Sequence, residues 1–319
     1  MESELPTSPQ AAQSASDQAI ARLAEAYLTD RRRERRWRIF FRLAWLLLAV
    51  TLVVMIYRQG LESSAPSAAH TALIDVRGEI AMDVEASAEN IISALRNAFG
   101  DSGARAVVLR INSPGGSPVQ AGMINDEIER LRLAHDKPVY AVCEEMCASA
   151  AFYIAAAADE VFVDKASLVG SIGVLMDGFG FTGLMDKLGV ERRLMTAGEN
   201  KGFLDPFSPQ TEQHKAYAQA MLNQIHQQFI AEVREGRGER LSKDDEVYSG
   251  LIWSGQQAID LGLADRYGSL DYVAREVVKA EEIIDYTPRQ NVAERLAKRF
   301  GAAVGEGMVA ALRGVGTLR

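Results

Sequence analysis

The first candidate for chemistry in this chain is Ser149, which stands at the start of an uncharged stretch. Residues 150–158 carry no charge and are mostly good helix formers, so they predict a buried helix with Ser149 in its first turn. Backbone N–H groups in a helix's first turn lack intrahelical partners, and the helix dipole is positive there. A serine at this place can therefore meet negative charge that develops on a substrate oxygen. Taken alone, the pattern also fits a serine that only caps the helix.

A second candidate is the loop at residues 112–117, which reads Asn-Ser-Pro-Gly-Gly-Ser. It lies between an expected strand and an expected helix, where ligands usually approach an open α/β sheet. Gly115 and Gly116 would let backbone N–H groups come close to a substrate carbonyl, as an oxyanion hole requires. A tight loop without a ligand remains an alternative. The loop lacks the Gly-Lys-Ser/Thr ending of a phosphate-binding loop.

A nucleophilic serine needs a base, and the four histidines are poorly placed to supply one. They fall in a linker, at a helix end and twice in one long helix: His70, His135, His214 and His226. The sequence also lacks a Gly-x-Ser-x-Gly elbow and a His-Glu-x-x-His motif. A catalytic pair of serine and lysine is the arrangement that remains open. Burial lowers the pKa of a lysine, so that its neutral amine can accept the serine proton. Lys201 is the candidate, in a loop with two phenylalanines, although a simply solvated lysine is the alternative.

Composition excludes several classes of function. Up to Arg58 the chain has nine basic and six acidic residues, so the remainder carries a net charge of −11. An acidic body without a basic stripe argues against a nucleic-acid partner. The only cysteines are Cys143 and Cys147, which we interpret as small apolar fillers, with a reactive or disulfide-bonded pair as the alternative. Because the sequence has no zinc-binding Cys or His cluster, we expect no metal and no other cofactor.

The N-terminal part predicts a membrane anchor. Residues 39–57 are apolar except for Arg42 and Thr51, and nineteen helical residues span about the thickness of a bilayer core. Six arginines precede this segment closely, so residues 1–38 are expected to be a cytoplasmic tail. We therefore expect a single-pass protein of a bacterial inner membrane with its catalytic domain in the periplasm. A cleaved signal peptide is the less favoured alternative, because the charged region before the span is long.

After a linker at residues 58–70, residues 71–286 show repeated β-α units, which predict an α/β fold around a mostly parallel sheet. Strands are expected at residues 71–76, 105–111, 139–143 and 160–163. Helices are expected at residues 87–99, 117–134, 208–235 and 270–282. Residues 287–319 form a C-terminal tail, in which residues 291–312 predict an amphipathic helix.

Four segments together resemble the signal peptide peptidase A family of bacterial serine peptidases, which have a ClpP/crotonase-type fold. They are residues 112–117, residues 149–160, residues 170–174 and Lys201 with residues 205–209. The resemblance covers about residues 72–286. It implies that Ser149 is the nucleophile, that Lys201 is the general base and that Ser171 positions the lysine amine. It also implies a homo-oligomeric ring in which the lysine can reach the serine of a neighbouring subunit.

One departure from the family concerns the nucleophile. The family commonly has Ser-Gly-Gly there, whereas this chain has Ser149 followed by two alanines. Alanine adopts helical backbone angles easily but disfavours positive φ, so activity requires the helix to begin directly after Ser149. The Ala150 N–H is then an oxyanion donor beside Gly115 or Gly116.

The sequence thus predicts a membrane-anchored serine endopeptidase with a Ser-Lys dyad, acting on released signal peptides or other short apolar peptides. Two alternatives come from other classes. The chain could be a non-catalytic membrane scaffold of the same fold, which the two alanines keep open. It could also perform acyl-CoA chemistry of the crotonase type, which a membrane anchor and a Ser-Lys pair suit poorly.

Overall fold

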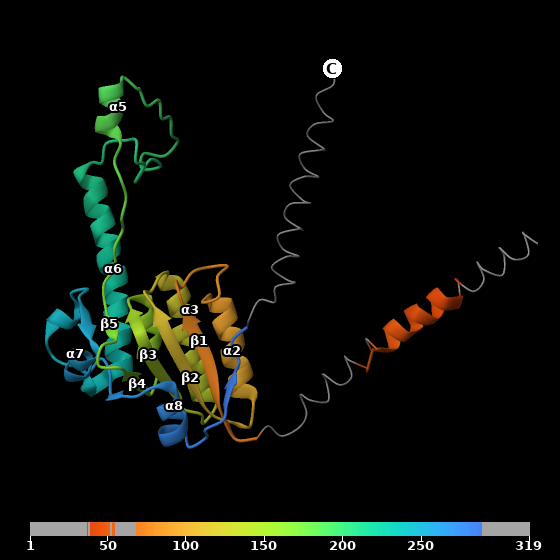
Figure 1. Ribbon diagram of the computed structural model, residues 1–319. Coiled ribbons are helices and arrows are strands. Elements are labelled where there is room, and N and C mark those ends of the chain that lie inside the picture. Colours follow the sequence, from red (N-terminus) through yellow and green to blue (C-terminus); the bar gives the residue numbers. More distant parts are fainter. Residues whose placement is uncertain (1–36, 38, 52, 55–67, 289–319) are drawn as a thin grey trace, which may run out of the picture. The chain divides into compact units, whose positions relative to one another are not determined.

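The computed structural model describes residues 37, 39–51, 53–54 and 68–288 (Figure 1). The chain divides into two compact units, Met1–Pro66 and Ser67–Arg319. In the first unit, residues 39–51 and 53–54 are helical and their side chains are exposed. Among the residues that the structure describes, no helix has the length and apolar character needed to cross a bilayer. The rest of the expected span, the basic tail and the expected helix at residues 291–312 lie outside the described residues.

The second unit is built on an eight-stranded sheet with strand order β6-β5-β3-β2-β1-β8. Its centre is formed by β1 (His70–Arg77), β2 (Ala104–Ser113) and β3 (Val139–Ala148), which are mutually parallel. At one edge β8 (Ile283–Asp285) pairs in parallel with β1. The expected α/β fold with a mostly parallel sheet is confirmed, and the antiparallel pair of β5 (Leu168–Gly170) with β6 (Ile252–Ser254) is the exception.

Strand β3 divides its pairing between two neighbours. Its first half pairs with β4 (Glu160–Val163), which also pairs with β7 (Arg266–Tyr267). Its second half, from Met146 to Ala148, pairs with β5 instead. The register against β2 shifts between these halves, because Ile111 lies opposite Cys143 whereas Ser113 lies opposite Cys147. Strand β3 therefore continues through this irregularity beyond the expected residues 139–143 and ends at Ala148, directly before Ser149.

Two apolar clusters cover the faces of the sheet. The larger one includes side chains from α2 (Ala88–Gly100), α3 (Pro118–Ala134) and α4 (Ala150–Ala156). The smaller one joins Val108, Val142 and Phe162 of the sheet to Val273, which belongs to the π-helix Val273–Val278 after the short α8 (Leu270–Tyr272). Both α2 and α3 begin one residue after the expected starts, because Ser87 and Ser117 cap these helices and accept hydrogen bonds from their first turns.

Two predicted helices have different boundaries in the structure. The long helix α6 (Glu212–Arg237) begins after Thr211, whose hydroxyl caps it, and not at Ser208. The Ser208 hydroxyl instead donates to the Asp205 carboxylate at 2.6 Å, so a turn occupies the expected helix start. The helix expected at residues 270–282 ends at Val278, and the strand β8 that follows it was not predicted.

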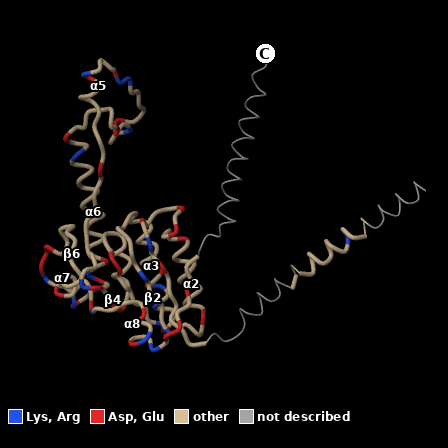
Figure 2. Tube along the Cα trace, in the orientation of Figure 1, with Lys and Arg blue, Asp and Glu red and all other residues tan. Residues whose placement is uncertain are grey.

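An arm extends from the sheet between β5 and the middle of α6 (Figure 1). It contains α5 (Thr182–Leu188) and long connecting loops, and α6 returns the chain to the body. Large apolar side chains of the arm are exposed, including Met195 at 94%, Leu175 at 83% and Phe179 at 77%. Figure 2 shows charges of both signs distributed over the body and the arm, without a continuous basic stripe in the described part.

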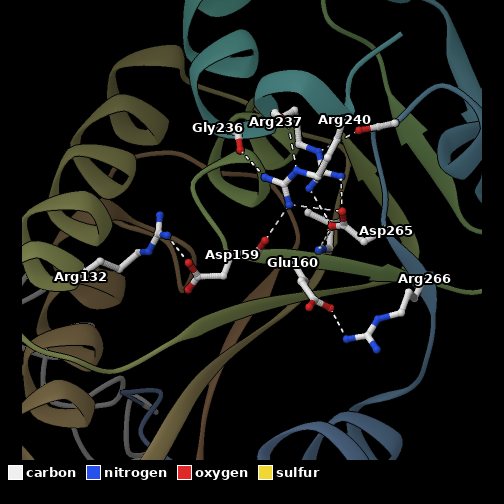
Figure 3. Close-up of polar contacts among 10 residues, drawn as sticks. Arg132, Asp159, Glu160, Gly236, Arg237, Arg240, Asp265 and Arg266 are labelled. Carbon is white, nitrogen blue, oxygen red and sulfur yellow. Dashed lines mark hydrogen bonds and ion pairs between the residues drawn. The ribbon is translucent and has the colours of Figure 1, made fainter.

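The base of α6 is held by a buried ionic network (Figure 3). Arg237 is fully buried. Each of its two terminal nitrogens donates a hydrogen bond of 2.8 Å to the Asp265 carboxylate. Arg240 donates to the Asp159 carbonyl at 2.8 Å and to Gly236 at 2.7 Å. Burial opposes the ionisation of Asp265, but hydrogen bonds from Arg237 and the Val161 N–H outweigh it and hold the pKa of this carboxyl below its ordinary value.

We expect Arg237→Met to destabilise the protein by about 3–5 kcal/mol near pH 7, because it leaves Asp265 charged without its main partner. A carboxyl with a lowered pKa contributes stability above its unfolded pKa and loses that contribution as the pH falls. The difference between wild type and variant should therefore shrink below about pH 4. Urea unfolding at pH 7 and at about pH 3 measures both quantities. Adding Asp265→Asn to Arg237→Met should recover part of the loss, and no recovery would contradict an electrostatic cause.

Candidate active site

Ser149 lies between the end of β3 and the start of α4, in a strained backbone conformation. Its φ is 54° and its ψ is −125°, which non-glycine residues rarely adopt. Its N–H donates to the Gly170 carbonyl at 2.8 Å, and its own carbonyl accepts from Tyr153 at 3.0 Å. The Ser149 hydroxyl makes no capping hydrogen bond. The prediction that Ser149 belongs to the first turn is wrong by one residue, because the bond to Gly170 holds Ser149 outside the helix.

The helix begins at Ala150, directly after Ser149, as the two alanines require. Ala150 has no positive φ, so the residues that replace the glycines of the family pattern fit without strain. The Ala150 N–H belongs to the first turn of α4, where no earlier helical carbonyl can accept it. Among the described residues, this N–H is therefore a backbone donor without a partner beside Ser149.

The Gly115-Gly116 loop packs directly against the nucleophile candidate. A Cβ added to Gly115 would lie 2.7 Å from Ser149 Cβ and 3.0 Å from the Ala150 nitrogen. A Cβ added to Gly116 would lie 2.2 Å from the carbonyl oxygen of Ile80, which accepts from the Ser117 N–H. The Gly115 N–H already donates to Ser113 Oγ at 3.1 Å. Gly116 donates no hydrogen bond within the described part of the chain, so its N–H, unlike that of Gly115, has no partner there.

Gly115→Ala should therefore lower kcat by about 10²-fold or more, because a methyl group would displace Ser149 or the oxyanion donors. The backbone at Gly115 has a φ of 104°, which adds strain to any other residue. Gly78→Ala provides a control, because Gly78 also has a positive φ but nothing lies within 4 Å of its added Cβ. Steady-state hydrolysis of a peptide substrate compares the two variants. Equal losses would indicate that backbone strain and not the site contact is responsible.

The end of β5 and the residue after it form a further part of the surroundings of Ser149. Gly170 supplies the carbonyl that binds the Ser149 N–H, and Ser171 follows it with a φ of 51°. The Ser171 N–H donates to the Leu251 carbonyl at 2.8 Å. The structure therefore brings together five of the expected site residues: Gly115, Gly116, Ser149, Ala150 and Ser171.

Lys201 does not join this group within one chain. It is exposed in the loop between α5 and α6, which belongs to the arm. Its N–H donates to the Gly198 carbonyl at 3.1 Å, which forms a turn. The two phenylalanines of this loop pack on other rings, since Phe203 packs on His214 and Tyr217 and Phe207 stacks on Phe181. The arm was not apparent in the sequence, because its loops have no regular periodicity.

The other groups considered for chemistry have structural environments. Cys143 and Cys147 are buried free thiols, and burial together with the neighbouring Cys143 raises the pKa of Cys147. Within the described ranges, no group of three or more His, Cys, Asp or Glu side chains could hold a metal ion. A cavity of about 400 Å³ is lined by Val142, Tyr267 and Leu270 among others, and Ser149 is not part of its lining.

Comparison with known proteins identifies relatives of this chain. The model of peptidase family S49 matches residues 132–283. A protein of Methanocaldococcus jannaschii named as a protease is 33% identical over 70% of this chain and 73% of its own length. A protein of Enterococcus faecium named as a signal peptide peptidase is 28% identical over 62% of this chain and 58% of its own length.

A further relative is larger. A Na⁺/H⁺ antiporter of Brucella abortus is 44% identical over 55% of this chain, and the match covers 24% of the antiporter. The chain thus spans about a quarter of the length of that relative, and the name of the relative describes the whole antiporter.

The chain folds as an α/β protein with a mostly parallel sheet, and its relatives include proteins named as proteases. The chain belongs to peptidase family S49.

Proposed function

We propose that this protein is a membrane-anchored endopeptidase in which Ser149 is the nucleophile and Lys201 the general base. The observation that carries the proposal is the strained Ser149, held between Gly115 and the Gly170 carbonyl and followed at once by α4. Strain of this kind persists only where the surrounding structure enforces it, and it occurs often at active sites. A purely structural helix cap would not need it.

In the proposed reaction, the Ser149 hydroxyl oxygen attacks the peptide carbonyl carbon while a neutral lysine amine accepts the hydroxyl proton. The Ala150 and Gly116 N–H groups bind the oxyanion of the tetrahedral intermediate. The ammonium of Lys201 then returns the proton to the leaving amine, which leaves an acyl ester on Ser149. Water hydrolyses the ester in a second step with the same lysine as base. No metal or cofactor takes part in this scheme.

We infer that Lys201 acts on the Ser149 of a neighbouring copy in a homo-oligomer. The lysine loop lies on an exposed arm, and the arm carries exposed Leu175, Phe179 and Met195. Exposed apolar surfaces of this extent are typical of protein contacts. A neighbouring subunit would exclude water from the lysine amine and so favour its neutral form. Ser171, next to the Gly170 carbonyl, would then orient the incoming amine.

The proposed substrates are released signal peptides or other short apolar peptides. Residues 39–57 would anchor the protein in a bacterial inner membrane and leave the body on the periplasmic side, as the six preceding arginines favour. Apolar peptides released from the membrane on that side would then share a compartment with the body. The Enterococcus faecium relative named as a signal peptide peptidase supports this substrate class.

Labelling with a fluorophosphonate tests the proposal. The wild-type protein should take up one label per chain, and peptide mass mapping should locate it on Ser149. Coenzyme A thioesters should neither bind nor compete with the label. Absence of labelling under conditions where a fluorogenic apolar peptide is also left intact would instead support a non-catalytic scaffold.

A further inference from the structure

His226 on α6 contacts the segment that holds the nucleophile, although sequence reasoning assigned it no role. Its Nε2 lies 3.0 Å from the Ile172 carbonyl oxygen. Because a carbonyl only accepts, Nε2 is the donor and carries the proton. Ile172 is fully buried and lies two residues after Gly170, whose carbonyl accepts the Ser149 N–H. The imidazole therefore ties α6 to the segment that supports Ser149.

The segment at residues 170–173 has further contacts that fix its opposite side. Besides the Ser171 bond to Leu251, the Gly173 N–H donates to the Ser171 carbonyl at 2.9 Å. A Cβ added to Gly173 would lie 3.1 Å from Gly250 Cα, so two backbones meet there closely. Residues 250–251 thus support one side of the segment, and His226 supports the other.

The same face of α6 also contacts the helix that follows the nucleophile. Phe229, three residues after His226, packs on Tyr153 with ring centroids 5.1 Å apart. The Tyr153 N–H donates to the Ser149 carbonyl. Residues three apart on a helix lie on one face, so His226 and Phe229 reach both flanks of Ser149. Toward its N-terminus α6 leads directly into the loop that contains Lys201.

We propose that His226 is a positioning residue for Ser149. Its hydrogen bond to Ile172 holds Gly170 and Ser171 in place, and the Gly170 carbonyl in turn keeps Ser149 at its positive φ. The inference rests on the proposed catalytic role of Ser149. It assigns His226 no proton transfer, because Nε2 is engaged with a carbonyl. Ile172 and His226 lie on the two segments that connect the arm to the body. The same hydrogen bond therefore joins these two segments and holds the residues that position Ser149.

Two substitutions in the full-length protein separate the hydrogen bond from the shape of the side chain. His226→Leu removes the donor, whereas His226→Gln places an amide N–H near the position of Nε2. Gln227→Leu is the matched control, since Gln227 is exposed on the same turn. Hydrogen exchange of the peptide that contains the Ser149 amide is measured together with kcat and KM for a fluorogenic apolar peptide. Melting temperature and oligomer size are measured for all three variants.

For His226→Leu we expect exchange at the Ser149 amide to accelerate about tenfold and kcat to fall about tenfold with KM within about twofold. His226→Gln should stay within about threefold of wild type in both quantities. The proposal is overturned if exchange in His226→Leu is unchanged, if His226→Gln is damaged equally, or if the loss follows a change in melting temperature or oligomer size. If the wild-type protein takes no label on Ser149, the proposed function fails, but the exchange result still decides the coupling.

Discussion

Ser149→Ala should reduce peptide hydrolysis by about 10⁴-fold or more, because no acyl-enzyme can form without the hydroxyl oxygen. Fluorophosphonate labelling should disappear in the same variant. The expected residual rate reflects the Ala150 and Gly116 donors, which can still bind an oxyanion when water attacks directly. Steady-state assays with a fluorogenic peptide and gel fluorescence of the label measure the two effects. Ser242→Ala, at a half-buried hydroxyl after α6 that accepts from the Asp244 N–H, should hydrolyse and label like wild type.

The backbone at Ser149 adds a stability test to this experiment. Glycine adopts a φ of 54° and a ψ of −125° without a Cβ clash, whereas serine and alanine do not. Ser149→Gly should therefore be as inactive as Ser149→Ala but more stable than wild type by about 1 kcal/mol. Such a gain would show that the native serine is retained at a cost in stability. Retained hydrolysis in either variant would contradict the assignment of the nucleophile.

Lys201→Arg should lower kcat as much as Lys201→Ala, in both cases by about 10³-fold. Arginine keeps the positive charge but does not become neutral in a protein, so it cannot accept the serine proton. A lysine that only contributed charge or a surface contact would tolerate arginine. Lys215→Arg is a suitable control, because Lys215 is an exposed lysine of α6 that pairs with Glu212. Near-normal turnover of Lys201→Arg would contradict the proposed base.

Mixing inactive variants determines which chain supplies the lysine. When chains with Ser149→Ala and chains with Lys201→Ala are unfolded together and reassembled, a lysine acting between subunits restores intact sites. With random assembly of equal amounts, about a quarter of the interfaces should be active. A lysine acting within its own chain would restore none, because no chain then has both residues. Size-exclusion chromatography with light scattering verifies that the mixture has the wild-type assembly state.

Much of the fold could be predicted from local signals in the sequence. The helices expected at residues 87–99 and 117–134 match α2 and α3 within one residue, because the capping serines Ser87 and Ser117 act on residues close in sequence. The apolar runs marked β1, β2 and β4 within a few residues. The start of α6 was missed because the Ser208 hydroxyl binds Asp205, which competes with capping. The second half of β3 was missed because its two glutamates interrupt the apolar pattern.

The candidate site could be predicted in part. The glycine loop and the serine before an uncharged stretch identified Gly115, Gly116 and Ser149 by residue type, and the structure places them side by side. The backbone groups that hold these residues in place were not predictable from residue type. The Ile80 carbonyl beside Gly116 and the Gly170 carbonyl at Ser149 act through backbone atoms, which every residue has. His226 had been set aside because a helical histidine has no special signal of its own.

The sequence by itself determined the strands β1, β2 and β4, the helices α2 and α3, and the loop of small residues beside a possible nucleophile. These features depend on side-chain type and short-range periodicity. Only the tertiary structure decided that Ser149 is held at positive φ outside its helix, that Lys201 stands on an exposed arm, and that His226 reaches Ile172. Each of these depends on contacts between segments distant in the chain, which local patterns do not encode.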